Sequence, residues 1–82
     1  MSELDKLRAI VNGEFRTIKV FLFPSRIIKF LKSEYNAKIG EVDTNGWALD
    51  FFIPVTINGT SYTIEGSIYN SDHCKFYENS NY

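Results

Sequence analysis

The chain has 82 residues, which suffices for one small domain with a single hydrophobic core. Apolar residues form 44% of it and aromatic residues 16%, a composition that excludes an intrinsically disordered chain. The net charge of −1 excludes a general binder of polyanions, although residues 1–38 carry eight basic against four acidic side chains and residues 39–82 carry one against six.

Cysteine content and the N-terminal segment bear on the location of the protein. The single Cys74 cannot form an internal disulfide, and charged side chains interrupt residues 1–20, where a secretory signal would be apolar. A reducing compartment, the cytoplasm, is therefore expected, and no membrane partner is expected.

The first predicted element is a helix. Ser2 is a capping residue and Asp5 stands three positions later, as in a capping box, while the apolar residues that follow share one face. The pair Asn12-Gly13 ends this helix. Residues 15–23 are rich in β-branched and aromatic residues in alternation, so they predict a strand.

A second helix is predicted to open at Pro24 and Ser25. Its apolar residues fill one arc, which has to pack against the sheet, and the opposite arc carries a basic stripe of Arg26, Lys29 and Lys32. After this helix, turn signals separate four predicted strands, at residues 38–42, 47–57, 60–69 and 74–78. Residues 1–82 form one domain, and 79–82 are predicted to be a frayed tail.

The strongest local signal is the pair Asn58-Gly59 between two alternating runs, because this pair favours a two-residue type I′ turn. The turn fixes a register in which the numbers of cross-strand partners sum to 117. The partners on the apolar face are then Val55 with Tyr62, Ile53 with Ile64, and Phe51 with Gly66. A slip of one residue would expose this whole apolar set.

The preceding hairpin, over residues 38–50, has two registers that the sequence leaves open. A two-residue loop at Asn45-Gly46 sets Glu41 against Asp50, which is a like-charge pair. A three-residue loop at 44–46 avoids that pair but turns Glu41 inward. Pro54 has no N–H to donate, so the pairing is expected to stop near it.

The predicted order α-β-α-β-β-β-β indicates an α+β fold, with two helices packed on one face of an antiparallel sheet of about five strands. In element order and length, residues 2–78 resemble the phage uracil-DNA glycosylase inhibitor family. Members of that family are strongly acidic and use an acidic edge strand and second helix to imitate DNA. The corresponding segments of this chain carry basic residues instead: Arg16, Lys19, Arg26, Lys29 and Lys32.

No residue pattern indicates catalysis, a cofactor or a metal site, so an enzyme is not expected. His73 and Cys74 are the only residues of their types, too few for a zinc site, and Cys74 is expected to pack as a small apolar residue. Asp50 and Glu65 fall on the same face of the sheet, where both are expected to be solvated rather than to share a catalytic cleft.

The outer face of the sheet is the predicted partner surface. Phe52 and Tyr69 are predicted to lie there, because the helices cover the other face. Together with Asp50 and Glu65 they would form an amphipathic, acidic-rimmed patch of the kind that binds proteins. The sequence thus predicts a small inhibitor, adaptor or regulator of a protein partner, of the size that phages and mobile elements often encode.

Two other functions stay open. The basic stripe, which Lys6 or Arg8 of the first helix would extend, is compatible with a nucleic-acid-binding module in which each phosphate contact adds a salt-dependent increment. An open sheet edge at strand 74–78 is compatible with a homodimer. The salt dependence of binding, and the surface at which mutations weaken it, separate the nucleic-acid function from protein binding.

Overall fold

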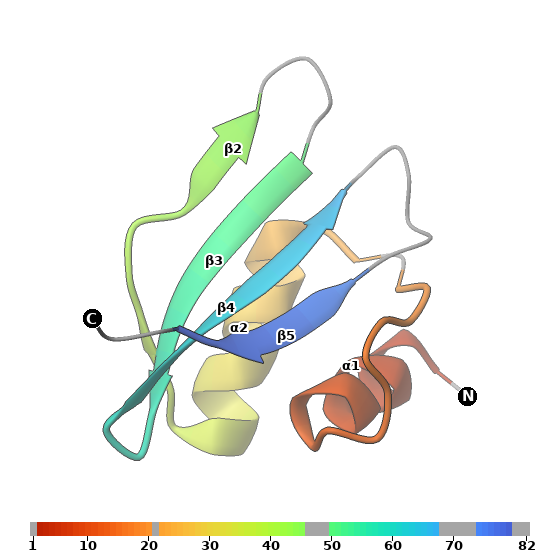
Figure 1. The fold of residues 1–82 in the computed structure, drawn as a ribbon, viewed down its shortest axis with the longest axis horizontal. Coiled ribbons are helices and arrows are strands. Elements are labelled where there is room, and N and C mark those ends of the chain that lie inside the picture. The colour runs from red at the N-terminus through yellow and green to blue at the C-terminus, as the bar shows by residue number, and fades with distance from the viewer. Residues whose placement is uncertain (1, 21, 46–49, 68–73, 80–82) are drawn as a thin grey trace.

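The computed structural model describes residues 2–20, 22–45, 50–67 and 74–79 of the chain. Within these ranges two helices come first and five strands follow: α1 (Glu3–Val11), α2 (Pro24–Tyr35), β1 (Lys38–Ile39), β2 (Asp43–Asn45), β3 (Asp50–Ile57), β4 (Thr60–Ser67) and β5 (Lys75–Glu78). The strands form one antiparallel sheet in the order β1-β3-β4-β5, and β2 also pairs with β3. In Figure 1, α2 lies behind the sheet and α1 lies beside the β5 edge, and the two helices with one antiparallel sheet confirm the predicted α+β fold.

The helix ends form where local residues predict them. The Ser2 hydroxyl accepts a hydrogen bond from the Asp5 backbone N–H (3.1 Å), and the Asp5 carboxylate accepts one from the Ser2 N–H (3.3 Å), which completes the capping box of α1. Gly13 follows the helix with a φ of +80°. The second helix begins at Pro24 and ends where Asn36 adopts a left-handed φ of +51°.

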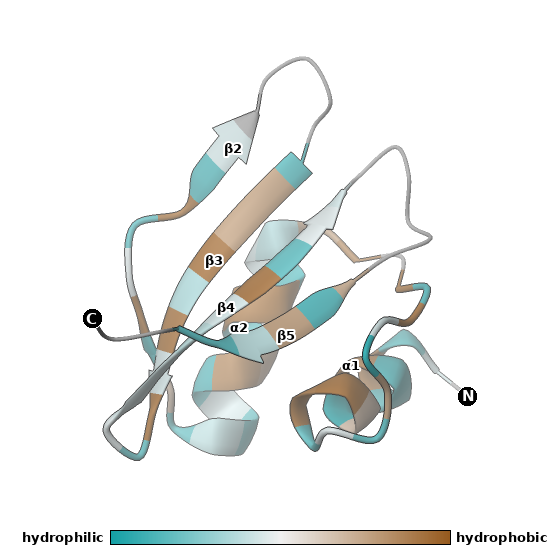
Figure 2. Cartoon of the chain, in the orientation of Figure 1, coloured by the Kyte–Doolittle hydropathy of each residue, from teal (hydrophilic) through white to brown (hydrophobic). Residues whose placement is uncertain are grey.

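The β3–β4 hairpin has the predicted register. Asn58 and Gly59 have positive φ values of 51° and 82°, as a type I′ turn requires. The positions of every partner pair along the two strands sum to 117. Hydrophobic and hydrophilic residues alternate along these strands (Figure 2), so one face of the hairpin enters the core and the other faces outward.

The inner face of this hairpin is tightly packed where Phe51 and Gly66 face each other. A Cβ atom added to Gly66 would lie 2.7 Å from Cζ of the Phe51 ring, which is far inside van der Waals contact, so glycine makes room for the ring. The core lies between this face and the two helices, and its most deeply buried side chains are Leu7, Ile10, Ile27, Leu31, Ile53 and Ile64.

The prediction of a strand over residues 15–23 is wrong. The described part of this segment makes one isolated bridge, in which Ile18 pairs antiparallel with Cys74. Residues 15–17 are exposed, and Val20 is buried in the core. β-Propensity alone does not make a strand, because a strand needs a partner along its length, and among the described positions only Ile18 meets one. The observed order is helix, helix, strands, which differs from the order on which the resemblance to glycosylase inhibitors rests.

Neither predicted register of the hairpin over residues 38–50 is found. Asn45 of β2 pairs with Asp50 of β3, whereas a two-residue loop would have paired Glu41 with Asp50. The connection between the strands is longer than either predicted loop, because it comprises positions 46–49, which lie outside the described residues. The like-charge pair therefore does not form.

The strand next to β3 is split in two at Pro54. The register of β1 against β3 differs by one position from that of β2, so residues 40–42 stand opposite only residues 53–54. The Gly40 N–H donates a hydrogen bond to the Pro54 carbonyl (2.8 Å), but Pro54 has no N–H to return. The proline was expected to stop the pairing; instead it interrupts the ladder, which resumes at β1.

The last described residue is anchored rather than frayed. The Asn79 N–H donates to the Ser61 carbonyl (2.9 Å), and the Thr63 hydroxyl donates to Oδ1 of Asn79 (2.6 Å), so the predicted tail 79–82 begins one residue too early. Residues 80–82 lie outside the described part. Across the ranges that the structure describes, neither helix is long and apolar enough to cross a membrane.

Candidate functional site

The outer face of the sheet is the surface that strand register defines most completely. Along β3, the side chains of Phe51, Ile53 and Val55 are buried in the core, so the residues between them point outward. No described helix or strand crosses in front of this face in Figure 1. On this face Phe52 and Glu65 are half-buried and Ser67 is buried.

Phe52 lies near the centre of the outer face between two carboxylates. Its cross-strand partners are Asp43 on β2 and Glu65 on β4, and Glu65 pairs in turn with Lys75 on β5. The Phe52 side chain is half-buried. A half-buried aromatic ring between two acidic cross-strand partners has the amphipathic character of a protein-binding anchor.

Three of the four residues predicted for the partner surface are brought together. Asp50 and Phe52 are two positions apart on β3, and Glu65 faces Phe52, so all three share the outer face. Tyr69, the fourth, lies outside the described residues.

Tyr77 of β5 also belongs to this face and was not predicted from the sequence. It faces Thr63 of β4, and 42% of its surface is exposed. Partial burial raises the pKa of the Tyr77 phenol, and the negative charge of Glu65 raises that pKa further, so the hydroxyl stays protonated at neutral pH. The signal was available: Cys74 was expected to point inward, and alternation then turns Tyr77, three positions later, outward.

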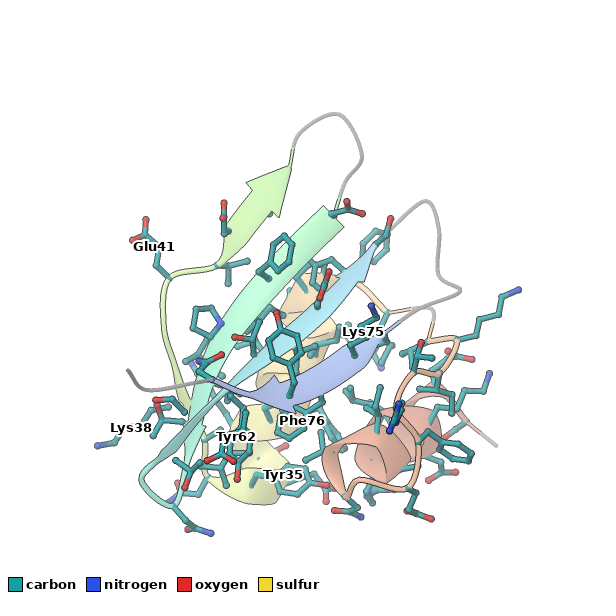
Figure 3. All side chains as sticks on the ribbon, viewed as in Figure 1. Tyr35, Lys38, Glu41, Tyr62, Lys75 and Phe76 are labelled. Atoms are coloured by element: carbon teal, nitrogen blue, oxygen red, sulfur yellow. The ribbon has the colours of Figure 1, made fainter. Side chains whose placement is uncertain are left out.

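The inner side of β5 confirms this alternation. Lys75 and Phe76 leave the strand in opposite directions (Figure 3). On the inner side, the ring of Phe76 stacks on Tyr62 of β4 with 4.7 Å between the ring centroids. The stack holds β5 against β4 with Phe76 on the inner side, so its chain neighbours Lys75 and Tyr77 point outward.

The basic stripe lies on the exposed side of α2. Arg26, Lys29 and Lys32 are all exposed, and no ion pair among the described residues joins any of them to a carboxylate. Lys6 does not extend the stripe, because its ammonium group pairs with Glu3 within α1 at 3.0 Å.

Arg8 does not extend the stripe either, because it joins the two helices. Its guanidinium group pairs with Asp5 of α1 at 2.8 Å and with Glu34 of α2 at 3.1 Å. The same group lies 5.4 Å from the centroid of the Phe30 ring. The bond to Glu34 raises the pKa of the Arg8 side chain, and the bond to Asp5 acts in the same direction, so this charge is committed to contacts within the protein.

A groove of about 340 Å³ lies between α1 and α2. Its lining residues are Leu4 from α1 and Arg26, Lys29, Phe30, Ser33 and Glu34 from α2. The Ser33 hydroxyl donates to the Lys29 carbonyl (3.0 Å) and is therefore turned toward its own helix. The groove combines an apolar base with two cations, and it could not be predicted because it depends on how the helices meet.

Cys74 is a poor candidate for chemistry. Burial raises the pKa of its thiol to about 11, so the reactive thiolate is scarce at neutral pH. Its N–H donates to the Ile18 carbonyl (2.8 Å) and its carbonyl accepts from the Ile18 N–H (3.2 Å), so one position of the edge expected to form a homodimer is occupied. His73 lies outside the described part, and no three metal-ligating side chains gather within that part.

Comparison with protein families, curated proteins and solved structures finds no match to this chain. Its function therefore has to be inferred from the two surfaces, the outer face of the sheet and the helix side with its basic stripe and groove.

Proposed function

We propose that this chain is a small macromolecule-binding protein that acts as an inhibitor, adaptor or regulator of a protein partner, which it binds through the outer face of the sheet. The observation that carries this proposal is the open face on which Phe52 and Tyr77 stand partly exposed beside Glu65. Binding energy in protein interfaces concentrates in a few aromatic or arginine anchors, which a polar rim surrounds.

Binding is better supported than catalysis. The one thiol, that of Cys74, is buried with a raised pKa. Asp50 and Glu65 lie on an open sheet face, where acid–base catalysis by a carboxylate pair has little support. We also assign the protein to the cytoplasm, because a free buried cysteine suits a reducing compartment. Its size fits a regulator that a phage or mobile element encodes.

The test begins with affinity capture from the source cell and compares variants. Phe52→Ala combined with Tyr77→Ala should abolish capture of the partner, because truncating two anchors costs roughly 2 kcal/mol or more each. Thr56→Ala, on the same outer face, is the matched control and should bind normally. Circular dichroism and urea unfolding of both variants verify that the domain is folded.

A nucleic-acid-binding module is the second candidate, and the exposed basic stripe favours it. We expect Arg26→Ala, Lys29→Ala and Lys32→Ala together to weaken partner binding by less than about tenfold, because exposed charges mainly tune the rate of association. The opposite pattern would replace the protein partner with nucleic acid. In that pattern the aromatic variant binds normally, the charge variant does not bind, and affinity falls steeply with salt.

A further inference from the structure

We infer that the groove between α1 and α2 is a second docking site, and that its ligand is an acidic amphipathic segment of a protein. Such a segment would place an apolar side chain on the base of the groove and carboxylates beside Arg26 and Lys29. The described residues that line this site come from α1 and α2 and not from the strands, and α2 lies behind the sheet in Figure 1, so the site is separate from the surface of the proposed function.

The first step concerns the charge at the start of α2. The positive end of a helix dipole favours an acidic side chain, but the first turn of α2 contains none, and no side chain caps it. Arg26 occupies this turn instead. A cation at this place slightly opposes helix stability, and together with Lys29 it makes this side of the groove attractive to anions.

The second step concerns Glu34, the one carboxylate among the described residues that line the groove. Its side chain is bonded to Arg8 at 3.1 Å, and Arg8 also pairs with Asp5, so one cation is shared by two carboxylates. Arg26 and Lys29 are left without an acidic partner among the described ion pairs. The described lining of the groove therefore carries a net charge of +1, from Arg26 and Lys29 against Glu34, and both cations can form an ion pair with a ligand.

The third step concerns the apolar base. Leu4 is half-buried and Phe30 is 5% exposed, so packing holds both side chains in place at the base of the groove. Arg8 lies against the Phe30 ring and holds α1 beside it. An apolar base next to two cations fits a Leu or Phe flanked by Glu, as on one side of an amphipathic helix. A phosphate backbone would have only two cations to contact here and no use for the apolar base.

The probe is a fluorescein-labelled helical peptide with Leu and Phe four residues apart and Glu at the flanking positions. We expect it to bind the native chain, and Arg26→Glu should weaken binding about tenfold or more. Lys32→Glu is the matched control, because it makes the same change in charge on the same helix but does not line the groove, and it should change affinity by less than about threefold. Arg26→Glu should leave the melting temperature unchanged or raise it, because it removes a cation from the first turn of α2.

Several results would overturn this inference. They are the absence of binding to the native chain, equal losses in the Arg26→Glu and Lys32→Glu variants, and equal binding of a peptide whose Glu residues are replaced by Gln. Preferential binding of duplex DNA with a steep salt dependence would assign the helix face to nucleic acid instead. Phe52→Ala with Tyr77→Ala should leave peptide binding intact, so a failure here is distinguishable from a failure of the proposed function.

Discussion

The outer face of the sheet and the groove between the helices are held by different kinds of contact. The sheet face takes its geometry from the continuous backbone ladder of β3 and β4, and one two-residue turn sets the place of every side chain on it. The groove depends on side chains that reach from α1 to α2, above all Arg8, which is 38% exposed. A surface on a ladder is thus set by local sequence, whereas a groove between helices is set by a few contacts between distant residues.

The largest expected effect comes from disturbing the ladder beneath the sheet face. Gly66→Ala should destabilise the domain by about 2 kcal/mol, because the added methyl group overlaps the Phe51 ring. Gly66 does not have a positive φ, so the backbone itself would accept alanine and the whole cost arises from this contact. Urea unfolding, with the midpoint and slope both recorded, measures the change.

A second substitution tests the assigned cause. Phe51→Leu removes the ring, so Gly66→Ala should cost less in that background than alone, and the two changes should be coupled. Strict additivity would show that the close approach of Phe51 to Gly66 does not limit the packing. A double variant at a distant pair, Gly13→Ala with Phe51→Leu, is the control and should be additive.

The elements that could be predicted from sequence are those in which the determining residues are adjacent. The pair Asn58-Gly59 defines both the turn and the register of β3 on β4, and Ser2 with Asp5 defines the start of α1. In these places the local preference and the global fold agree, so no knowledge of the rest of the chain is needed.

The elements that could not be predicted depend on partners far along the chain. Residues 15–23 have strand propensity, but their pairing depends on an edge more than fifty positions away, and only Ile18 finds it. The register near Pro54 depends on how a residue without an N–H is accommodated by the bulge at residues 40–42, which neither loop length anticipated.

The candidate site divides in the same way. The common face of Phe52 and Glu65 follows directly from the predicted register. The outward direction of Tyr77 follows from alternation along β5, but its place opposite Thr63 required the register of β5 on β4, which no short turn specifies within the described residues. The groove required the contact between Arg8 and Glu34, which are 26 positions apart and follow no local rule.

Cys74 pairs with Ile18, where the sheet meets the segment that joins α1 to α2. The pH dependence of protein stability tests whether the Cys74 thiol is buried at this contact. Burial raises the pKa of the folded-state thiol from 9.0 to about 11. Between these values the unfolded chain loses the thiol proton and the folded chain keeps it. The contribution of the thiol to the free energy of unfolding is therefore fully present below about pH 9 and is lost as pH rises toward 11. The expected loss is roughly 1 kcal/mol at about pH 10.

Urea unfolding across this pH range, compared with Cys74→Ala, isolates the thiol. Tyr35 and Tyr77 also have raised pKa values and contribute in the same direction at higher pH, but they remain in the alanine variant. The native chain should lose more stability than the variant between about pH 8 and pH 10. If the free energy of unfolding fell equally with pH in the native chain and in Cys74→Ala, Cys74 would not be buried at its contact with Ile18. Rapid reaction of the native thiol with Ellman's reagent at neutral pH would show the same.

The smallest expected effect is the coupling between Arg8 and Glu34, and it bears most directly on the comparison. Both side chains are accessible to solvent, with exposed fractions of 38% and 44%, and ion pairs that water reaches are weak because water and salt screen them. Arg8→Gln and Glu34→Gln, alone and together, form a double-mutant cycle in urea unfolding. We expect a small favourable coupling at low salt that disappears at high salt, with global stability almost unchanged in every variant.

The affinity of the acidic peptide should nevertheless fall in Arg8→Gln, because α1 is no longer held beside Phe30 and Glu34 can turn toward Lys29. Lys6→Gln, which breaks the pair within α1 alone, is the control and should leave peptide affinity unchanged. If Arg8→Gln instead destabilised the domain as much as Gly66→Ala, the helix layer would rest on this contact as firmly as the sheet rests on its ladder. The two surfaces would then not differ in the way proposed.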